Sequence, residues 1–151
     1  MSLRDELKRL NITIPQLAGP FGSYVPARRS GNLIFISGQL PMREGKLLAT
    51  GAVPSRCTVE QARLAASQCV INALAAAATA IDLDHLRGVV RIGVFVNSDP
   101  AFFEQPKVAN AASELLIQLF GEKGQHARAA VGVSSLPLDA AVEIEFVFDG
   151  D

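Results

Sequence analysis

The stretch that decides the fold lies near the C-terminal end of the chain, at residues 125–150, and reads QHARAAVGVSSLPLDAAVEIEFVFDG. It predicts two strands joined by a turn at Leu136 and Pro137. Side chains alternate between the two faces of a strand with a period of two. One face of the first predicted strand therefore carries His126, Arg128, Ala130 and Gly132.

The second predicted strand has one face for the core and one face with charge. Its apolar face holds Val142, Ile144, Phe146 and Phe148. The other face carries Glu143 and Glu145. A row of bulky apolar residues is what a core requires, whereas a guanidinium and two carboxylates on these strands exceed that requirement. Function is therefore expected at these charged residues.

Outward from this stretch, the chain predicts the element order β-β-α-β-α-β-β after a short N-terminal helix. Ser2 is the expected cap of that helix, and Thr58 with Gln61 forms a capping-box pattern that begins the first long helix. Apolar periodicity predicts the other elements. They are a hairpin of 24–28 and 32–37, a helix from 58 to about 81, a central strand at 89–96 that is covered on both faces, and a helix at 106–121.

These elements define an α+β fold in a single domain over residues 1–151, of which residues 1–17 are the N-terminal helix and lead-in. Two such helices cover one face of a five- or six-stranded sheet. The strands carry Val, Ile and Phe on both faces, and hydrophobic residues make up 49% of the chain while charged residues make up 19%. We therefore expect a second subunit to cover the other face of the sheet.

Charge and composition argue against several classes of function. The formal net charge is −1 and aromatic residues make up 6% of the chain, without a basic stripe, which argues against nucleic-acid binding. The first twelve residues lack the apolar core of a signal peptide, and the most apolar segment, 70–81, is too short to span a bilayer. Cys57 and Cys69 lack metal-ligand spacing and are expected to be free thiols. We expect a cytoplasmic protein that binds no metal and no membrane.

Several polar residues could carry chemistry, and each also has a structural interpretation. Arg128 lies among small residues, so its guanidinium can bind an anion, reach solvent, or pair with a carboxylate of the last strand. Those carboxylates are either solvated or able to place a water and move a proton. His126 shares the face of Arg128 and is a candidate proton carrier. Tyr24 can place a hydroxyl in a pocket or pack, and Asn110 can cap the second long helix or stay exposed.

Two signatures, together with the positions of Tyr24 and Asn110, resemble those of the Rid family, the reactive intermediate deaminases, also called YjgF-like proteins or endoribonuclease L-PSP. Residues 31–41, GNLIFISGQLP, are similar to the family signature GN-x-(I/V)-x-x-SGQ-x-P. The C-terminal signature AR…LP…(V/I)E(I/V)E is similar to residues 127–128, 136–137 and 142–145. These motifs occur in the family's order along the chain.

The resemblance implies a chorismate-mutase-like fold, assembled as a homotrimer with a cleft between each pair of neighbouring subunits. Active members of the family hydrolyse imine and enamine intermediates, such as 2-aminoacrylate, to 2-keto acids and ammonia without a cofactor. The expected substrate is therefore a small carboxylate-bearing metabolite. The alternative is a protein that binds or senses a small carboxylate in the same clefts without turnover. The family's ribonuclease label is opposed by the near-neutral charge.

The resemblance also implies the roles of individual residues. Arg128 would hold the substrate carboxylate, and Glu143 would hold the attacking water together with the backbone carbonyl of Ala130. The substrate pocket would be lined by Tyr24 and Gly38, and Asn110 falls where the family has an asparagine early in its second helix. We also expect His126 at this pocket, because it shares the face of Arg128.

This chain also departs from the family pattern. His126 stands where the family commonly has a proline, and Ala130 stands where it often has cysteine or serine. The extra N-terminal helix and the larger loop between Met42 and Cys57 resemble the longer branch of the family. His126 either adds an acid–base group or fills space.

Overall fold

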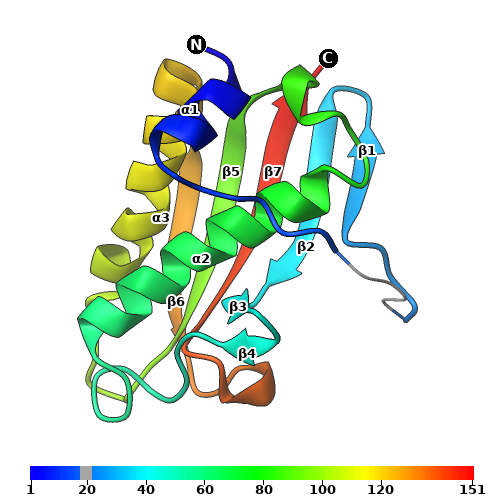
Figure 1. The fold of residues 1–151 in the computed structure, drawn as a ribbon. Coiled ribbons are helices and arrows are strands. Elements are labelled where there is room, and N and C mark those ends of the chain that lie inside the picture. The colour runs from blue at the N-terminus through cyan, green and yellow to red at the C-terminus, as the bar shows by residue number, and fades with distance from the viewer. Residues whose placement is uncertain (18–21) are drawn as a thin grey trace.

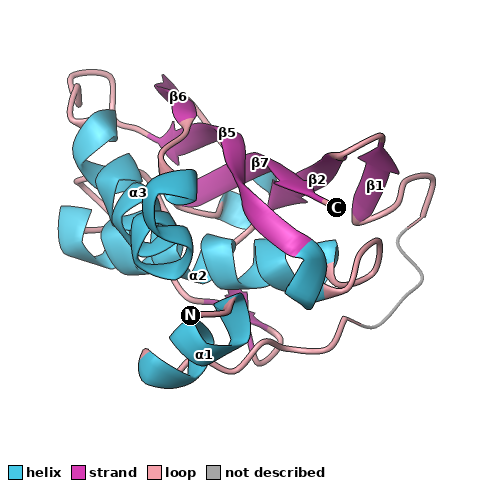
Figure 2. Cartoon of the chain, turned by 90° about the horizontal axis from the view of Figure 1, so that it is seen from above, coloured by secondary structure: helices cyan, strands magenta, loops and turns pink. Residues whose placement is uncertain are grey.

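A computed structural model describes residues 1–17 and 22–151 and shows a five-stranded sheet with helices on one face (Figures 1 and 2). The predicted order of strands and long helices is confirmed. The strands of the sheet are β1 (Ala27–Ser30), β2 (Leu33–Gln39), β5 (Leu86–Asn97), β6 (Ala127–Val133) and β7 (Val142–Gly150), and β3 (Met42–Arg43) and β4 (Lys46–Leu47) form a separate small hairpin. The helices are α1 (Leu3–Arg9), α2 (Val59–Ala77) and α3 (Gln105–Phe120), with 3-10 turns at Leu83–His85, Gly121–Gly124 and Pro137–Asp139.

Local capping signals set where the helices begin. The Ser2 side chain accepts a hydrogen bond from the backbone N–H of Asp5 at the start of α1. Thr58 and Gln61 form the predicted capping box at the start of α2. The expected end of α2 near Ile81 is wrong by about one turn, because the hydroxyl of Thr79 takes the carbonyl of Ala76 and the chain tightens there into turns.

The two strands of the C-terminal stretch, β6 and β7, are not neighbours. The strand order is β1-β2-β7-β5-β6, in which β5 pairs parallel with β6 and antiparallel with β7. The crossover through α3 returns the chain to the outer edge of β5, so β6 becomes an edge strand. β7 then enters between β2 and β5 and takes the centre, where the sequence predicted the strand at 89–96.

The core lies between the sheet and the long helices. The apolar row of β7 is at most 2% exposed and comprises Val142, Ile144, Phe146 and Phe148. α2 approaches this row closely because many of its inward side chains are alanines with no exposed area, among them Ala62, Ala66, Ala73 and Ala77. α1 packs against α3 on the side of the helices that faces away from the sheet (Figure 2).

The opposite face of the sheet is not covered by any described element of the chain (Figure 2). Phe35 is 46% exposed and Val131 is 45% exposed on this face. β5 is therefore covered on one face within this chain, not on both as expected, and Arg91 is exposed on its open side. None of the helices in the described part is long and apolar enough to cross a membrane.

Candidate functional site

Arg128 extends from the edge strand β6 toward α3. Its backbone is in register with Ile92 of β5, which is fully buried, so both side chains lie on the face that the helices cover. The guanidinium donates through Nη1 to Oδ1 of Asn110 at 2.8 Å and to Oγ of Ser113 at 3.1 Å. Both partners come from α3. The helix therefore holds Arg128 at the rim of the sheet, where the side chain is still exposed.

Part of the Arg128 guanidinium has no hydrogen-bond partner among the described residues. An arginine side chain has five N–H donors, two of them on Nη1. Both Nη1 contacts go to α3, whereas Nε and Nη2 have no partner among residues 1–17 and 22–151. The Nε–Nη2 edge is a fork that matches a carboxylate bidentately. Arg128 makes no ion pair within the described chain, and Glu145 pairs instead with Arg91 at 3.3 Å.

His126 lies next to the same contact, on the face of Arg128 as predicted. Its Nε2 is 2.9 Å from Oγ of Ser113, and its Nδ1 is 2.6 Å from the carbonyl oxygen of Gly124. We call Asn110, Ser113, His126 and Arg128 the arginine cluster. Sequence reasoning missed Ser113, although its place three residues after Asn110 puts the two on one side of α3.

Glu143 lies on the other face of the sheet, beside Gly38 of β2. The pairing of β2 with β7 shifts register between Ile36 and Gln39, which leaves Gly38 in an irregular part of the strand. A side-chain carbon at Gly38 would overlap Oε1 of Glu143, so only glycine leaves room for the carboxylate as it lies here. The carboxylate is half-buried. Burial raises the pKa of Glu143, and the nearby Glu145 raises it further.

Contacts from α2 fix the strand end that carries Gly38. Cys69 donates from Sγ to the carbonyl of Gln39 at 3.3 Å. Asn72 donates from Nδ2 to the carbonyls of Leu40 and Met42, at 3.0 Å and 2.9 Å. Both free cysteines, Cys57 and Cys69, are buried, and burial raises the pKa of both thiols. Cys69 is therefore a structural donor and not a nucleophile.

Tyr24 lies just before β1 and is 63% exposed. It borders a surface hollow of about 620 Å³ in front of β1 and β2. The hollow is also lined by Gly22, Ser23, Val25, Arg28, Phe35, Ile36 and Ser37. No group of three or more His, Cys, Asp or Glu side chains that could hold a metal ion occurs among the described residues.

The predicted site residues thus fall into two groups that one chain does not bring together. Arg128, Asn110 and His126 meet at the β6 edge, where Ala130 is also on the face of Arg128 and is half-buried. Glu143 lies beside Gly38, two strands away and on the opposite face. Adjacent strands are about 4.8 Å apart, so roughly 10 Å of sheet separates the β6 and β7 backbones and roughly 19 Å separates β6 from β1.

The sequence and the α+β fold match one family of proteins. A family model described as "YjgF/chorismate mutase-like, putative endoribonuclease" matches residues 5–149. The chain belongs to this family. The predicted chorismate-mutase-like fold and the resemblance to YjgF-like proteins are confirmed.

Individual relatives cover nearly the whole chain. Protein TCP17 of Trypanosoma cruzi is 43% identical over 141 residues, which is 92% of this chain and 88% of that protein. The crystal structure of protein Atu1372 from Agrobacterium tumefaciens is 43% identical, with a TM-score of 0.91, and the match covers 99% of this chain and 92% of that one. A 2-iminobutanoate/2-iminopropanoate deaminase of Dermatophagoides farinae is 29% identical over 137 residues, 90% of this chain and 92% of the deaminase.

Proposed function

We propose that this protein hydrolyses small 2-imino acids and their enamine forms to 2-keto acids and ammonia. The observation that carries the proposal is the free Nε–Nη2 edge of Arg128, which α3 holds at the rim of the sheet. A relative at 29% identity, the Dermatophagoides farinae protein, bears the name of a 2-iminobutanoate/2-iminopropanoate deaminase.

Arg128 binds the carboxylate that every 2-imino acid carries. Two parallel N–H donors fix the plane of the carboxylate as well as its position. The imine carbon is attached directly to the carboxylate carbon, so the same contact also positions the reacting atom. An imine is already electrophilic, and orientation of the substrate supplies much of the catalysis it needs.

Glu143 then activates the attacking water as a general base. The carboxylate accepts a proton from water as the oxygen attacks the imine carbon, and Glu143 passes this proton to the nitrogen, which gives a neutral carbinolamine. Glu143 then takes the proton of the carbinolamine hydroxyl and delivers it to the amino group, so that the C–N bond breaks, the carbonyl group forms and ammonia leaves. Burial raises the pKa of Glu143, which brings this carboxyl closer to neutral pH and suits it to both accept and donate. The backbone carbonyl of Ala130 is the proposed second contact of the water.

The complete site lies between two copies of the chain. Arg128 is on the β6 edge, whereas Tyr24, Gly38 and Glu143 belong to the β1–β2–β7 side. A contact that joins unlike edges is head-to-tail, and head-to-tail contacts form a ring when the rotation between subunits closes. A ring of three would also cover the open sheet face with its exposed Phe35. We therefore propose a homotrimer with the substrate in each inter-subunit cleft.

The direct test is ammonia release from 2-iminopropionate, which an amino-acid oxidase generates in situ from alanine. We expect the purified protein to accelerate ammonia release in proportion to its concentration. Absence of acceleration would contradict the deaminase proposal. Binding of pyruvate by calorimetry in a protein that shows no turnover would instead support the alternative, a protein that binds small carboxylates as a sensor.

A further inference from the structure

We propose that Ser113 and His126 act together as a positioning pair that selects which edge of the Arg128 guanidinium meets the ligand. This inference rests on the proposed role of Arg128 as carboxylate anchor, but it concerns two residues outside the reacting groups. It starts from the hydrogen bonds that connect Gly124, His126, Ser113 and Arg128 in a chain.

The direction of each hydrogen bond follows from the first one. The carbonyl oxygen of Gly124 can only accept, so Nδ1 of His126 carries the hydrogen and donates to it. In the neutral imidazole, Nε2 is then an acceptor, and the hydroxyl of Ser113 donates to it. This leaves the lone pairs of the Ser113 oxygen for the Nη1 donor of Arg128.

The imidazole also keeps the Ser113 hydroxyl from donating to the backbone of its own helix. A serine inside a helix tends to donate its hydroxyl to the carbonyl four residues earlier, which here belongs to Ala109. Ser113 makes its side-chain contacts with His126 and Arg128 instead. We infer that removal of the imidazole returns the hydroxyl to the helix backbone and withdraws one of the two acceptors that hold Nη1.

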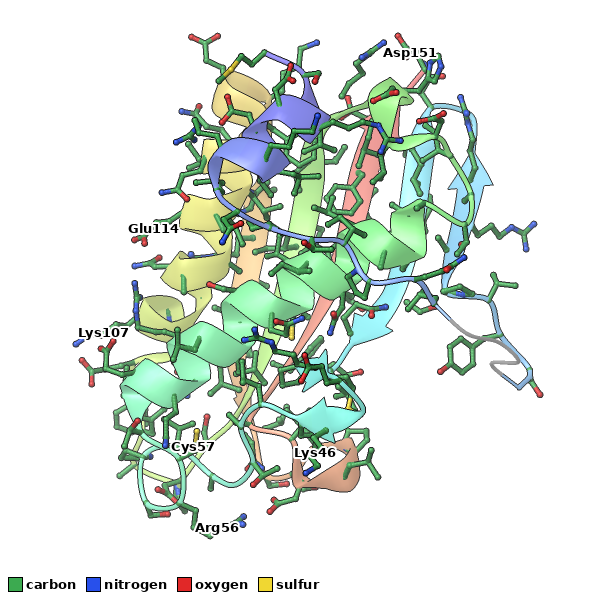
Figure 3. All side chains as sticks on the ribbon, viewed as in Figure 1. Lys46, Arg56, Cys57, Lys107, Glu114 and Asp151 are labelled. Carbon is green, nitrogen blue, oxygen red and sulfur yellow. The ribbon has the colours of Figure 1, made fainter. Side chains whose placement is uncertain are left out.

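The platform under His126 is fixed by close packing. Gly124 is buried in the 3-10 turn after α3, and a side-chain carbon there would overlap backbone atoms of Leu116 and Ile117. Its carbonyl is therefore held against the end of α3. Glu114, the residue after Ser113, points outward from α3 (Figure 3), and its carboxylate lies 3.4 Å from Arg63. Glu114 therefore pairs with α2 and makes no contact with the arginine cluster.

The pair affects the orientation of the guanidinium, because each of the two hydrogens on Nη1 of Arg128 has its own acceptor on α3. With Asn110 and Ser113 both in place, rotation of the guanidinium about its Nε–Cζ bond breaks two hydrogen bonds. The Nε–Nη2 edge is then the one presented outward. With Ser113 withdrawn, Asn110 alone holds Nη1, and the guanidinium samples other orientations in which the fork no longer faces the ligand.

Three variants separate this role from simple packing. Ser113→Ala removes the acceptor for Nη1, and His126→Asn keeps a donor for Gly124 but is too short to reach Ser113. His126→Gln places an amide acceptor near the position of Nε2 and is the conservative rescue. Ser67→Ala on α2 and His85→Gln at the surface are matched controls. Thermal unfolding of every variant shows whether it is folded.

The readouts are the Kd of pyruvate by calorimetry, the split between KM and kcat, and the side-chain ¹⁵N spectrum of Arg128. Loss of one hydrogen bond to a charged group corresponds to roughly tenfold in binding. We expect Ser113→Ala and His126→Asn to raise the Kd and KM by about that factor with kcat nearly unchanged, and His126→Gln to restore most of the loss. Rotation of the guanidinium is expected to be slow in the wild type and fast in these two variants.

The outcomes distinguish the two proposals. Pyruvate binding that Ser113→Ala and His126→Asn leave unchanged overturns the positioning pair while the carboxylate anchor stands. Equal loss in all three variants, together with a lowered Tm, identifies a packing role and also overturns it. A wild type that neither binds pyruvate nor accelerates ammonia release refutes the proposed function. In that case, slow guanidinium rotation that becomes fast in His126→Asn still supports the pair, and rotation that does not change refutes it.

Discussion

Arg128→Ala is expected to abolish detectable pyruvate binding and to lower kcat/KM for 2-iminopropionate at least about 100-fold. The variant removes a bidentate, charge-assisted contact, and such contacts to charged groups contribute about 1.5–3 kcal/mol per hydrogen bond. Stability should change little, because the Arg128 side chain is exposed and its partner Asn110 is exposed as well. Calorimetry with pyruvate and the ammonia assay measure the two effects.

Arg128→Lys and Arg29→Ala complete this experiment. A lysine ammonium is a point charge without a planar fork, so it cannot satisfy Asn110, Ser113 and a carboxylate together, and we expect most of the loss to remain. Arg29 is an exposed arginine on the other edge strand that donates to the carbonyl of Gly31, and its removal should leave activity unchanged. Pyruvate binding that survives in Arg128→Ala would refute the carboxylate anchor.

Glu143→Gln is expected to lower kcat by about 10²- to 10⁴-fold, the range of positioned proton transfer, while the Kd of pyruvate stays within about threefold. The amide has the shape of the carboxylate but cannot accept the proton of the water. In the wild type, kcat/KM should fall as the pH is lowered. Because the pKa of Glu143 is raised, this fall should be centred at a pH above the pKa of an ordinary glutamate. The control is Glu145→Gln, which removes the ion pair with Arg91 and should keep turnover.

The same substitution has an expected effect on stability. Because burial raises the pKa of Glu143, the folded state binds this proton more tightly than the unfolded state does. The favourable contribution is complete below the unfolded pKa and is lost as the pH rises through the folded pKa. Glu143→Gln should therefore gain unfolding free energy relative to the wild type between pH 4 and pH 8, at a fixed protein concentration. A constant difference across this range would contradict the burial of the carboxylate.

The sequence predicted best those features whose cause is local. The capping box of Thr58 and Gln61 begins α2 through contacts within a few residues. The faces of β7 followed from alternation alone. The roles of Arg128 and Glu143 came from a resemblance, and they stay predictions.

Features that depend on distant pairing could not be predicted in the same way. Nothing in the residues of β6 or β7 shows that β5 lies between them, because strand neighbours are chosen by the crossover and by packing of the whole sheet. Ser113 has no signature inside α3 until β6 is known to lie alongside it. The end of α2 depended on one hydroxyl, that of Thr79, which competes with the helix ladder.

The placement of Arg128 and Glu143 on different strands and different faces has a genetic consequence. If each cleft takes its arginine from one chain and its glutamate from the next, every chain contributes to two clefts. A substitution of either residue then inactivates only one of those two clefts. Chains that carry Arg128→Ala and chains that carry Glu143→Gln are each inactive alone. In a mixed ring they complement each other, because some clefts then join an intact arginine to an intact glutamate. Activity would then depend on the two residues that meet at each interface between chains, and not on either chain alone.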